Sequence, residues 1–378
     1  MIIGDCTEII SGFAFKSKQF NSEGNGTPLV RIRDVGKNNC ETFFEGEYKE
    51  EYVLNNGDFL VAMDGEFRLA EWSGGKALLN QRVCKIVPKE DKVHDRYLLY
   101  MLPKKLKRIE DTTSYVTVKH LSVKKIKNIE IPLPPLETQK KIASILDAAD
   151  AYRQKTKALI AKYDELTQSL FLDMFGDPVT NPKGWEKSQI DKACSKVTDG
   201  THDTPKRVNG GVKFITGKHI RPYKIDFNSS DFVALEVHQE IFKRCNPEYG
   251  DLLYTNIGAN VGTAAFNNVK YEFSMKNVAL FKPLKSHLNG RFLEFFLNSE
   301  NMKKEVIRIA SLGGAQKFLS LKDLRRLKVA LPPIGVQIDF ANRIEKMNEQ
   351  KAQAQESLEK AEELFSSLLQ RAFKGGVK

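Results

Sequence analysis

The sequence predicts a mixed α/β (α+β) protein: two domains of one fold, joined and separated by two long antiparallel coiled-coil helices, with an internal pseudo-twofold repeat. Three observations support this prediction. The same order of features occurs twice in the 378 residues. Each copy begins with short apolar runs that are typical of strands. Each copy then ends with a long stretch free of proline and glycine, in which apolar residues have heptad spacing.

The repeat is visible as three pairs of segments. GDFL from residue 57 returns as GDLL from residue 250, at an offset of 193. RYLLYML at 96–102 returns as RFLEFFL at 291–297, at an offset of 195. HLSVKKIKNIEIPLPPLETQ at 120–139 returns as FLSLKDLRRLKVALPPIGVQ at 318–337, at an offset of 198. The growing offset indicates small insertions, which loops tolerate, so the copies should share a scaffold and differ in their loops.

Strands are expected where apolar runs are punctuated by glycine or asparagine. In the first copy these runs are TPLVRIRDV, GDFLVAM and QRVCKIV, and in the second they are VKFITGKHI, GDLLYTNIG and KNVALFKP. Short helices are expected at 97–106 and 292–305.

Each copy closes with a long helix whose seam we assign at alternating spacings of three and four. The first seam is Ile142, Ile145, Ala149, Tyr152, Thr156, Leu159, Tyr163, Leu166 and Leu170. The second is Ile344, Met347, Lys351, Ala354, Leu358, Ala361, Phe365, Leu368 and Ala372. Packing of each helix on its own domain is the less favoured alternative, because a helix of roughly 57 Å would overrun a domain with a radius of gyration of about 14 Å. Two seams of equal length would bury each other best as an antiparallel pair.

Proline marks the entry into each long helix, in IPLPPL at 131–136 and LPPI at 331–334. Proline ends a strand because it lacks the N–H, and it costs a helix nothing in the first turn. An exposed polyproline ligand is the less favoured alternative. The expected division is a first domain at 1–131, a first long helix at 132–176, a second domain at 177–330 and a second long helix at 331–378.

Charge and cysteine content narrow the class of protein. The 59 Lys and Arg exceed the 48 Asp and Glu, giving a net charge of +11, which favours a polyanionic partner such as nucleic acid. Five widely spaced cysteines exclude C-x-x-C metal or redox motifs. The first residues lack a signal-peptide pattern, and no apolar run approaches the ~18 residues of a membrane span. We therefore expect a soluble protein of the reducing cytoplasm.

The combination of repeated variable domain, (I/A)-x-L-P-P-(L/I)-x-x-Q and long helix resembles the specificity subunit of type I restriction-modification systems. FGDPVTNPKGWE at 175–186 and VTDGTHDTP at 197–205 share this resemblance, which covers essentially the whole chain. It implies that the domains at 1–131 and 177–330 are target recognition domains, that each reads one half of a split DNA sequence, and that the helices act as a ruler. It also implies docking of two methyltransferase subunits, with motor-nuclease restriction subunits outside them. In this view the chain is not an enzyme and holds no cofactor, and S-adenosylmethionine binds to the partner. One departure is that GWE at 184–186 has no counterpart before the IGD at 3–5.

The alternative is a DNA methyltransferase or nuclease with an unrecognised active site. NPEY at 246–249 is one residue from an N-P-P-Y motif, but no G-x-G-x-x-G turn or phosphate loop is present. DGEFR at 64–68 and the run 272–276 only loosely suggest a nuclease pattern. His202 and Asp203 have no nucleophile at a fixed spacing. A scaffold that uses its charge only for solubility is a further alternative.

Candidate DNA contacts are basic or amide side chains in the loops, where Arg can pair with guanine and Asn or Gln with adenine. In the first domain we select Arg31, Arg33, Arg68, Asn80, Gln81, Arg82, Tyr115 and Lys119, with Lys124 and Lys125 on phosphates. In the second we select Thr201, His202, Lys218, His219, Asn256, Asn260, Lys276, Asn277, Gln316 and Lys317. Gln81 matches Lys276 in the repeat, and Lys119 matches Lys317. For partner docking we select Lys140, Lys141, Arg153 and Lys157, which lie outside the assigned seam.

Overall fold

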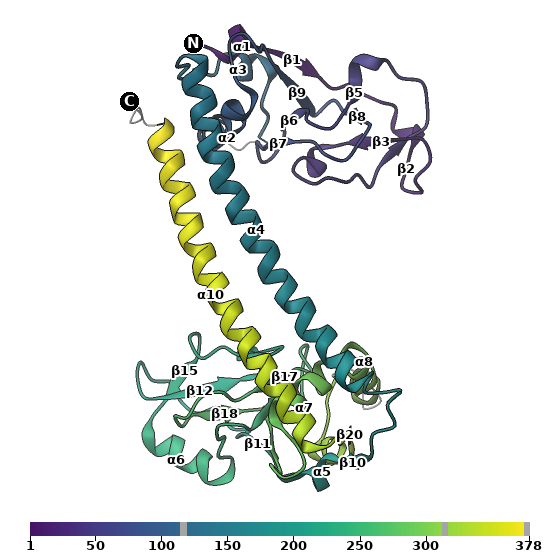
Figure 1. Ribbon diagram of the computed structural model, residues 1–378, viewed down its shortest axis with the longest axis vertical. Helices are drawn as coiled ribbons and strands as arrows, with labels where there is room; N and C mark the ends of the chain where they lie inside the picture. Colours follow the sequence, from purple (N-terminus) through teal and green to yellow (C-terminus); the bar gives the residue numbers. More distant parts are fainter. Residues whose placement is uncertain (114–118, 312–316, 374–378) are drawn as a thin grey trace. The chain divides into compact units, whose positions relative to one another are not determined.

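A computed structural model describes residues 1–113, 119–311 and 317–373 (Figure 1). The chain forms two compact units. The first contains Met1–Lys157 and the C-terminal part of the chain from Glu356, and the second contains Ala158–Gln355. The long helices α4, Leu136–Phe175, and α10, Ile334–Phe373, each contribute to both units. Each unit therefore consists of one strand-containing domain and a portion of both long helices.

The domain of the first unit contains two sheets. The four-stranded sheet has the order β1-β9-β6-β7, with β1 Thr7–Ser11, β6 Phe59–Ala62, β7 Leu69–Glu71 and β9 Val83–Pro88. The five-stranded sheet has the order β2-β4-β3-β8-β5, with β2 Phe20–Asn21, β3 Thr27–Val30, β4 Phe43–Phe44, β5 Val53–Leu54 and β8 Ala77–Leu79. The α-helices of this domain are α1 Ile3–Cys6, α2 Asp95–Thr112 and α3 Val123–Lys127.

The domain of the second unit repeats the four-stranded sheet and varies the rest. Its order is β11-β19-β16-β17, with β11 Cys194–Asp199, β16 Leu252–Tyr254, β17 Ala264–Phe266 and β19 Ala279–Pro283. A three-stranded sheet has the order β15-β12-β18, with β12 Val212–Thr216, β15 Asp231–Val233 and β18 Ser274–Lys276. Two strand pairs are β10 Lys187–Gln189 with β20 Lys328–Ala330, and β13 Ile220–Arg221 with β14 Lys224–Ile225. The α-helices are α5 Ile190–Ala193, α6 Leu235–Arg244, α7 Gly290–Asn298, α8 Glu300–Ala310 and α9 Leu321–Arg326.

The central strands β6 and β16 are buried on both faces of their sheets, which explains their continuous apolar sequences. In β6, Val61 packs in the cluster that contains α2, whereas Leu60 and Ala62 pack with the second sheet. In β16, Leu252 packs with α7 and α8, and Leu253 packs with residues of the three-stranded sheet. The predicted repeat and mixed α/β fold are therefore confirmed, and each domain has a helical layer, a four-stranded sheet and a second sheet.

The long helices are antiparallel within each unit, as predicted. In the first unit, Lys157 Nζ lies 2.9 Å from Glu362 Oε1, and the Arg153 guanidinium lies 4.2 Å from the ring centroid of Phe365. In the second unit, Phe171 packs against Phe340, and Lys351 pairs with Asp164. In both units, residue numbers along α10 thus fall as the numbers of the α4 residues that they contact rise.

The predicted seam is correct for α10 but wrong at four of its nine positions on α4. Every predicted α10 position is buried or half-buried. On α4, however, the predicted residues at 145, 152, 159 and 166 are all exposed, at 44%, 55%, 44% and 49%. Their places on the seam are taken by the next residue in each case, namely Leu146, Arg153, Ile160 and Thr167. On a helix, the residues three and four positions after a given residue both lie on the same face as that residue. The sequence did not decide which of the two belongs to the seam.

The predicted short helices differ in length from those observed. The first, expected at 97–106, is the longer helix α2. The second, expected at 292–305, is interrupted at Ser299 and forms α7 and α8. The break has a physical reason: Asn298 donates its Nδ2 to Ala264 O and accepts from Ala264 N, so the end of α7 is bonded to β17.

A buried glutamine explains the motif at the start of each long helix. Gln139 is 1% exposed, donates Nε2 to Pro134 O and Lys92 O, and accepts from His94 N at 2.9 Å. Gln337 is 0% exposed and makes the corresponding three contacts with Pro332, His287 and Asn289. One side chain thus ties the proline turn and the first turn of the helix to the loop before α2 or α7.

Candidate nucleic-acid interface

In the first domain, the loops that carry most of the candidates meet at one edge of the four-stranded sheet. The strand register pairs Ser11 with Cys84, Ala62 with Val83, and Val61 with Leu69, so the connected strand ends lie together. Isolated bridges add Phe13 to Asn80 and Asp64 to His120. We call residues 12–15, 63–68, 80–82 and 119–120 the first loop edge.

The first loop edge brings together Arg68, Gln81, Arg82 and Lys119. Gln81, Arg68 and Arg82 are exposed, and Lys119 donates Nζ to Glu110 O at 2.6 Å. Arg31 follows β3 beside this edge, because Asn80 N donates to Val30 O. Arg33 lies two residues further on and donates Nη2 to Thr42 at 2.9 Å. Tyr115 lies outside the described residues.

A buried carboxylate of α2 fixes one of these loops. Glu110 is 8% exposed and accepts from Phe67 N at 2.9 Å. The hydrogen bond from the Lys107 ammonium, together with that from Phe67 N, holds the pKa of Glu110 below its ordinary value. The carboxylate therefore stays ionised and keeps loop 63–68 in place.

The second domain assembles a matching edge. The register aligns Asp199 with Ala279, and Tyr254 with both Ala279 and Ala264. Bridges add Thr201 to Lys276 and Ile257 to Phe318. We call residues 200–204, 255–262, 276–278 and 317–318 the second loop edge. Its frame matches the first loop edge, since Gly65 N donates to Lys119 O and Gly258 N donates to Lys317 O.

Most candidates of the second domain lie on this edge. Lys276 contacts Thr204, and His202 Nδ1 lies 2.9 Å from Asn277 Oδ1. Asn260 and Lys317 are exposed. Lys218 follows β12, which pairs with β18 through Thr216 and Lys276, and its Nζ lies 3.3 Å from Asp231. Gln316 lies outside the described residues.

Three candidates are buried and bonded within their domains in this structure. Asn80 is 5% exposed, Asn256 is 4% exposed and His219 is 1% exposed. Asn256 donates Nδ2 to Leu319 O at 3.2 Å, and His219 Nδ1 accepts from Thr216 N at 2.9 Å. In this conformation they support the loops rather than present an edge to a ligand. Sequence alone did not distinguish these positions from exposed loop positions.

The two predicted phosphate contacts lie in a separate basic cleft. Lys124 and Lys125 are exposed on α3 and line a cleft of ≈ 830 Å³ together with Lys105 and Arg108 of α2. Among the lining residues, Glu130 is the one carboxylate. Such a cleft suits a phosphate backbone, which carries charge but no sequence information.

The predicted docking residues divide into two groups. Lys140 and Lys141 are exposed near the start of α4, where Lys140 pairs with Glu137. Arg153 and Lys157 instead contact α10 through Phe365 and Glu362. Their predicted position outside the seam was therefore wrong for Arg153, which takes a seam position.

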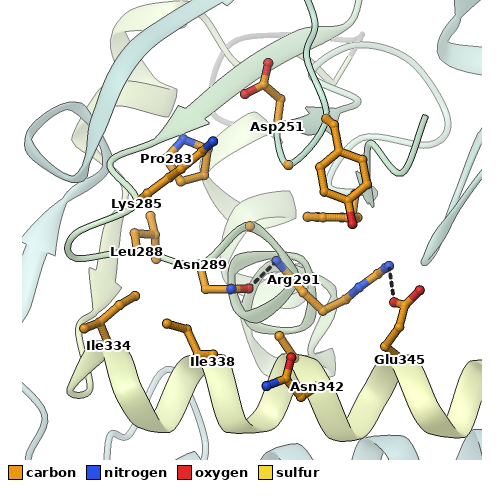
Figure 2. Close-up of a pocket in the computed structure, with 15 residues that line it drawn as sticks. Asp251, Pro283, Lys285, Leu288, Asn289, Arg291, Ile334, Ile338, Asn342 and Glu345 are labelled. Atoms are coloured by element: carbon orange, nitrogen blue, oxygen red, sulfur yellow. Dashed lines mark hydrogen bonds and ion pairs between the residues drawn. The ribbon is translucent and has the colours of Figure 1, made fainter. Parts of the chain in front are cut away.

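Matched cavities lie at the opposite end of each four-stranded sheet from its loop edge. The cavity of the second domain has a volume of ≈ 430 Å³ and is lined by Asp251, Arg291 and Ile338 (Figure 2). Arg291 reaches Glu345 on α10 in this view, at 3.6 Å. The first domain has a cavity of ≈ 520 Å³ in the corresponding place, lined by Asp58 and Lys140. The domains therefore repeat their attachment to the helices as well as their loop edges.

The residues considered above for catalysis make hydrogen bonds and ion pairs within their own domain. NPEY forms the turn before β16, where Glu248 N donates to Asp251. His202 Nε2 pairs with Asp199 at 3.1 Å. His238, which sequence reasoning missed, contacts Ser274 Oγ at 2.9 Å and Glu272 at 3.1 Å. Ser274 is 0% exposed, so this Ser-His-Glu arrangement has no access to a substrate and instead ties α6 to β18.

Neither a metal site nor a membrane-spanning helix is found among the described residues. No group of three or more His, Cys, Asp or Glu in residues 1–113, 119–311 and 317–373 has a geometry that could hold a metal ion. Within the same ranges, no helix combines the length and the apolar character needed to cross a bilayer.

Comparison with known proteins gives consistent matches. Residues 1–164 and 182–362 match the type I restriction modification DNA specificity domain. The chain is 31% identical over 400 residues to the type I restriction enzyme EcoBI specificity subunit of Escherichia coli, covering 97% of this chain and 83% of that protein. It is 24% identical over 340 residues to the MjaVIII specificity subunit of Methanocaldococcus jannaschii, covering 85% and 80%.

Solved structures share the fold. The crystal structure of a type I restriction-modification S subunit from M. genitalium aligns with a TM-score of 0.65 at 14% identity, covering 99% of this chain and 95% of that one. A chain from a study of complex assembly in the type I R-M system aligns with a TM-score of 0.57 at 15% identity, covering 100% and 97%. With two matched domain segments and the curated relatives in agreement, the chain belongs to the type I restriction-modification DNA specificity family.

Proposed function

We propose that this chain is the DNA sequence-specificity subunit of a type I restriction-modification complex. Each recognition domain reads one half of a bipartite double-stranded DNA site, and the long helices set the length of the unread spacer. The observation that carries this proposal is the pair of loop edges, which share hydrogen-bonded positions but differ in side chains. Gln81 is replaced by Lys276, and Arg82 by Asn277, at matched places. Different donors and acceptors on one frame are what two different half-sites require.

Affinity and sequence information come from different surfaces in this proposal. The α2–α3 cleft supplies phosphate contacts, which position the DNA. The exposed candidates of the loop edges supply base contacts. The four-part division at 131, 176 and 330 assigns one half-site to each recognition domain.

The partners are two methyltransferase subunits, with motor-nuclease restriction subunits outside them. The methyltransferase holds S-adenosylmethionine and performs the chemistry, while this chain, in the cytoplasm of a bacterial or archaeal cell, selects the site. Two matched cavities, one per domain, support docking of two copies of one partner. Lys140 lines one of them, and its repeat counterpart Ile338 lines the other.

Docking is tested on α4. Reversing Lys140 and Lys141 to Glu together should weaken assembly with the methyltransferase, measured by analytical ultracentrifugation, while circular dichroism stays unchanged. Lys155→Glu, which changes another exposed lysine of α4, is the matched control. Equal assembly of both variants would contradict docking at the start of α4.

The function itself is tested by co-expression with the methyltransferase and sequencing of methylated genomic sites. We expect a bipartite motif with an unread spacer, and Gln81→Ala should relax one half-site only. Coupled loss at both half-sites would contradict independent reading.

The alternative of an enzyme is tested with labelled S-adenosylmethionine: methyl transfer by the purified chain without a partner would refute the proposal. A scaffold would show equal gel shifts on random and selected duplexes.

A further inference from the structure

One pair of matched positions carries opposite chemistry on the two loop edges. In the first domain, Asp64 and His120 form an isolated antiparallel bridge. In the second, the bridge at the corresponding place joins Ile257 and Phe318. The residues after the bridge keep the same roles, since Ser122 and Ser320 both cap the following helix. A hydrogen-bonded polar pair in one domain therefore stands where the other exposes an apolar pair.

In the first domain the carboxylate of Asp64 contacts both His120 and Arg82. Asp64 accepts from His120 Nδ1 at 2.6 Å and pairs with Arg82 Nε at 3.3 Å. The Asp64 side chain is 16% exposed and the Arg82 side chain is 53% exposed. Because Asp64 engages Nε, both terminal nitrogens of Arg82 lack a partner among the described residues. A guanidinium held in this way offers two parallel donors, the geometry that fits O6 and N7 of guanine.

In the second domain the bridge pair is apolar yet accessible. Ile257 is 36% exposed and Phe318 is 48% exposed. The neighbouring residues Asn256 and Leu319 are buried and fix the backbone of this pair. Leu319 N donates to Asn256 O at 2.8 Å, and Asn256 Nδ2 donates to Leu319 O. Exposure of both side chains is thus imposed by the fold at this place. In the major groove, the apolar group that distinguishes one base from the others is the C5-methyl group of thymine.

We propose that these matched positions determine specificity, the first loop edge reading a guanine through Arg82 buttressed by Asp64, and the second contacting a thymine methyl group through Ile257 and Phe318. This inference rests on the proposed function and names the bases that it reads. The sequence pattern selected Arg82 as a DNA contact but did not select Asp64, His120, Ile257 or Phe318. The repeat held the signal, since His120 and Phe318 occupy the same place in it.

The test first selects duplexes from a random pool with the full chain in its methyltransferase complex. Arg82→Lys removes the paired donors, and Asp64→Asn weakens their anchor at nearly constant shape. Both should relax one guanine of the first half-site, with discrimination falling roughly 10- to 100-fold for Arg82→Lys and less for Asp64→Asn. Phe318→Ala and Ile257→Ala should relax a thymine of the second half-site. Each pair of variants is the control for the other, because the other half-site should be unchanged.

Base analogues then test the atoms. Replacing the guanine with 7-deazaguanine should weaken wild-type binding about 10-fold and Arg82→Lys binding much less. Replacing the thymine with deoxyuridine should weaken wild-type binding roughly 4-fold and leave Phe318→Ala binding unchanged. A bipartite consensus that no variant relaxes, or equal analogue effects in wild type and variant, would overturn this inference alone. Absence of any bipartite consensus would overturn the proposed function with it.

Discussion

Arg291 allows a sharp test of how a buried carboxylate of the second domain is stabilised. Its Nη1 pairs with Glu294 Oε2 at 2.7 Å, and Glu294 is 0% exposed. Replacing Arg291 with Met leaves a buried carboxylate without its counter-charge, a change that costs ~3–5 kcal/mol. The repeat counterpart Arg96 pairs with Asp147 and Glu71, whose side chains are 38% and 42% exposed. Solvent screens those pairs, so Arg96→Met should cost only ~0–1 kcal/mol.

The penalty should depend on pH. Burial raises the pKa of Glu294, although Arg291 acts in the opposite direction, and loss of Arg291 raises it further. A carboxyl whose pKa is raised on folding stabilises the native state below its ordinary pKa, and this contribution is lost as the pH rises through the native pKa. Arg291→Met should therefore be closer to wild type at pH 5 than at pH 8.

Thermal unfolding and hydrogen exchange of α7 measure both effects. For a unit of this size, ~3–5 kcal/mol corresponds to a fall of about 6–20 °C in Tm. Glu294→Gln added to Arg291→Met removes the charge but keeps the acceptor for Phe266 N, and it should recover most of the loss. The reasoning would be refuted by equal Tm values for Arg291→Met and Arg96→Met, or by a penalty independent of pH.

Three further predictions concern the helix entry, the basic cleft and the seam. Gln139→Leu leaves three backbone groups without partners and should cost ~2–5 kcal/mol in denaturant unfolding, whereas Gln154→Leu on the exposed face should be near neutral. Alanine at Lys124 and Lys125 should weaken all duplexes about equally and reduce the slope of log K against log salt by roughly 0.9 per lost phosphate contact; loss confined to one sequence would contradict a backbone role. A fragment of residues 1–182 lacks the α10 residues that cover α4, so it should dimerise through α4 and select an inverted repeat of the first half-site. A monomer in light scattering would contradict that pairing.

The sequence was sufficient for whatever depends on the repeat and on apolar periodicity. The alternating spacing of three and four predicted the α10 seam correctly, since it selects Phe365, which is buried, over the neighbouring Leu364, which is exposed. On α4, large apolar residues such as Tyr152 stand next to the true seam positions, and hydropathy selects them. The structure instead uses Arg153, because its guanidinium covers the ring of Phe365. That choice depends on the partner helix, which a single helical pattern does not contain.

The candidate site was predictable only in part, for a similar reason. The repeat located the loops, but exposure within a loop depends on contacts from distant segments. Asn256 looks like a surface amide in the sequence, but it is buried and its side-chain Nδ2 donates to the backbone oxygen of Leu319. Conversely, Phe318 has the composition of a core residue, and the bridge to Ile257 leaves it exposed.

The make-up of the first unit has a consequence for the order in which the protein folds during synthesis. The second unit is a continuous segment, Ala158–Gln355, whereas the first needs residues from Glu356 onward to complete it. Ile142 and Leu146 share a cluster with Phe365, so this part of α4 cannot complete its packing until α10 has been synthesised. The ribosome must first synthesise the second unit, Ala158–Gln355, which takes roughly 10–40 s at ~5–20 residues per second. Over that interval the face of α4 that packs on α10 lacks its partner, so the domain that is made first is the one completed last.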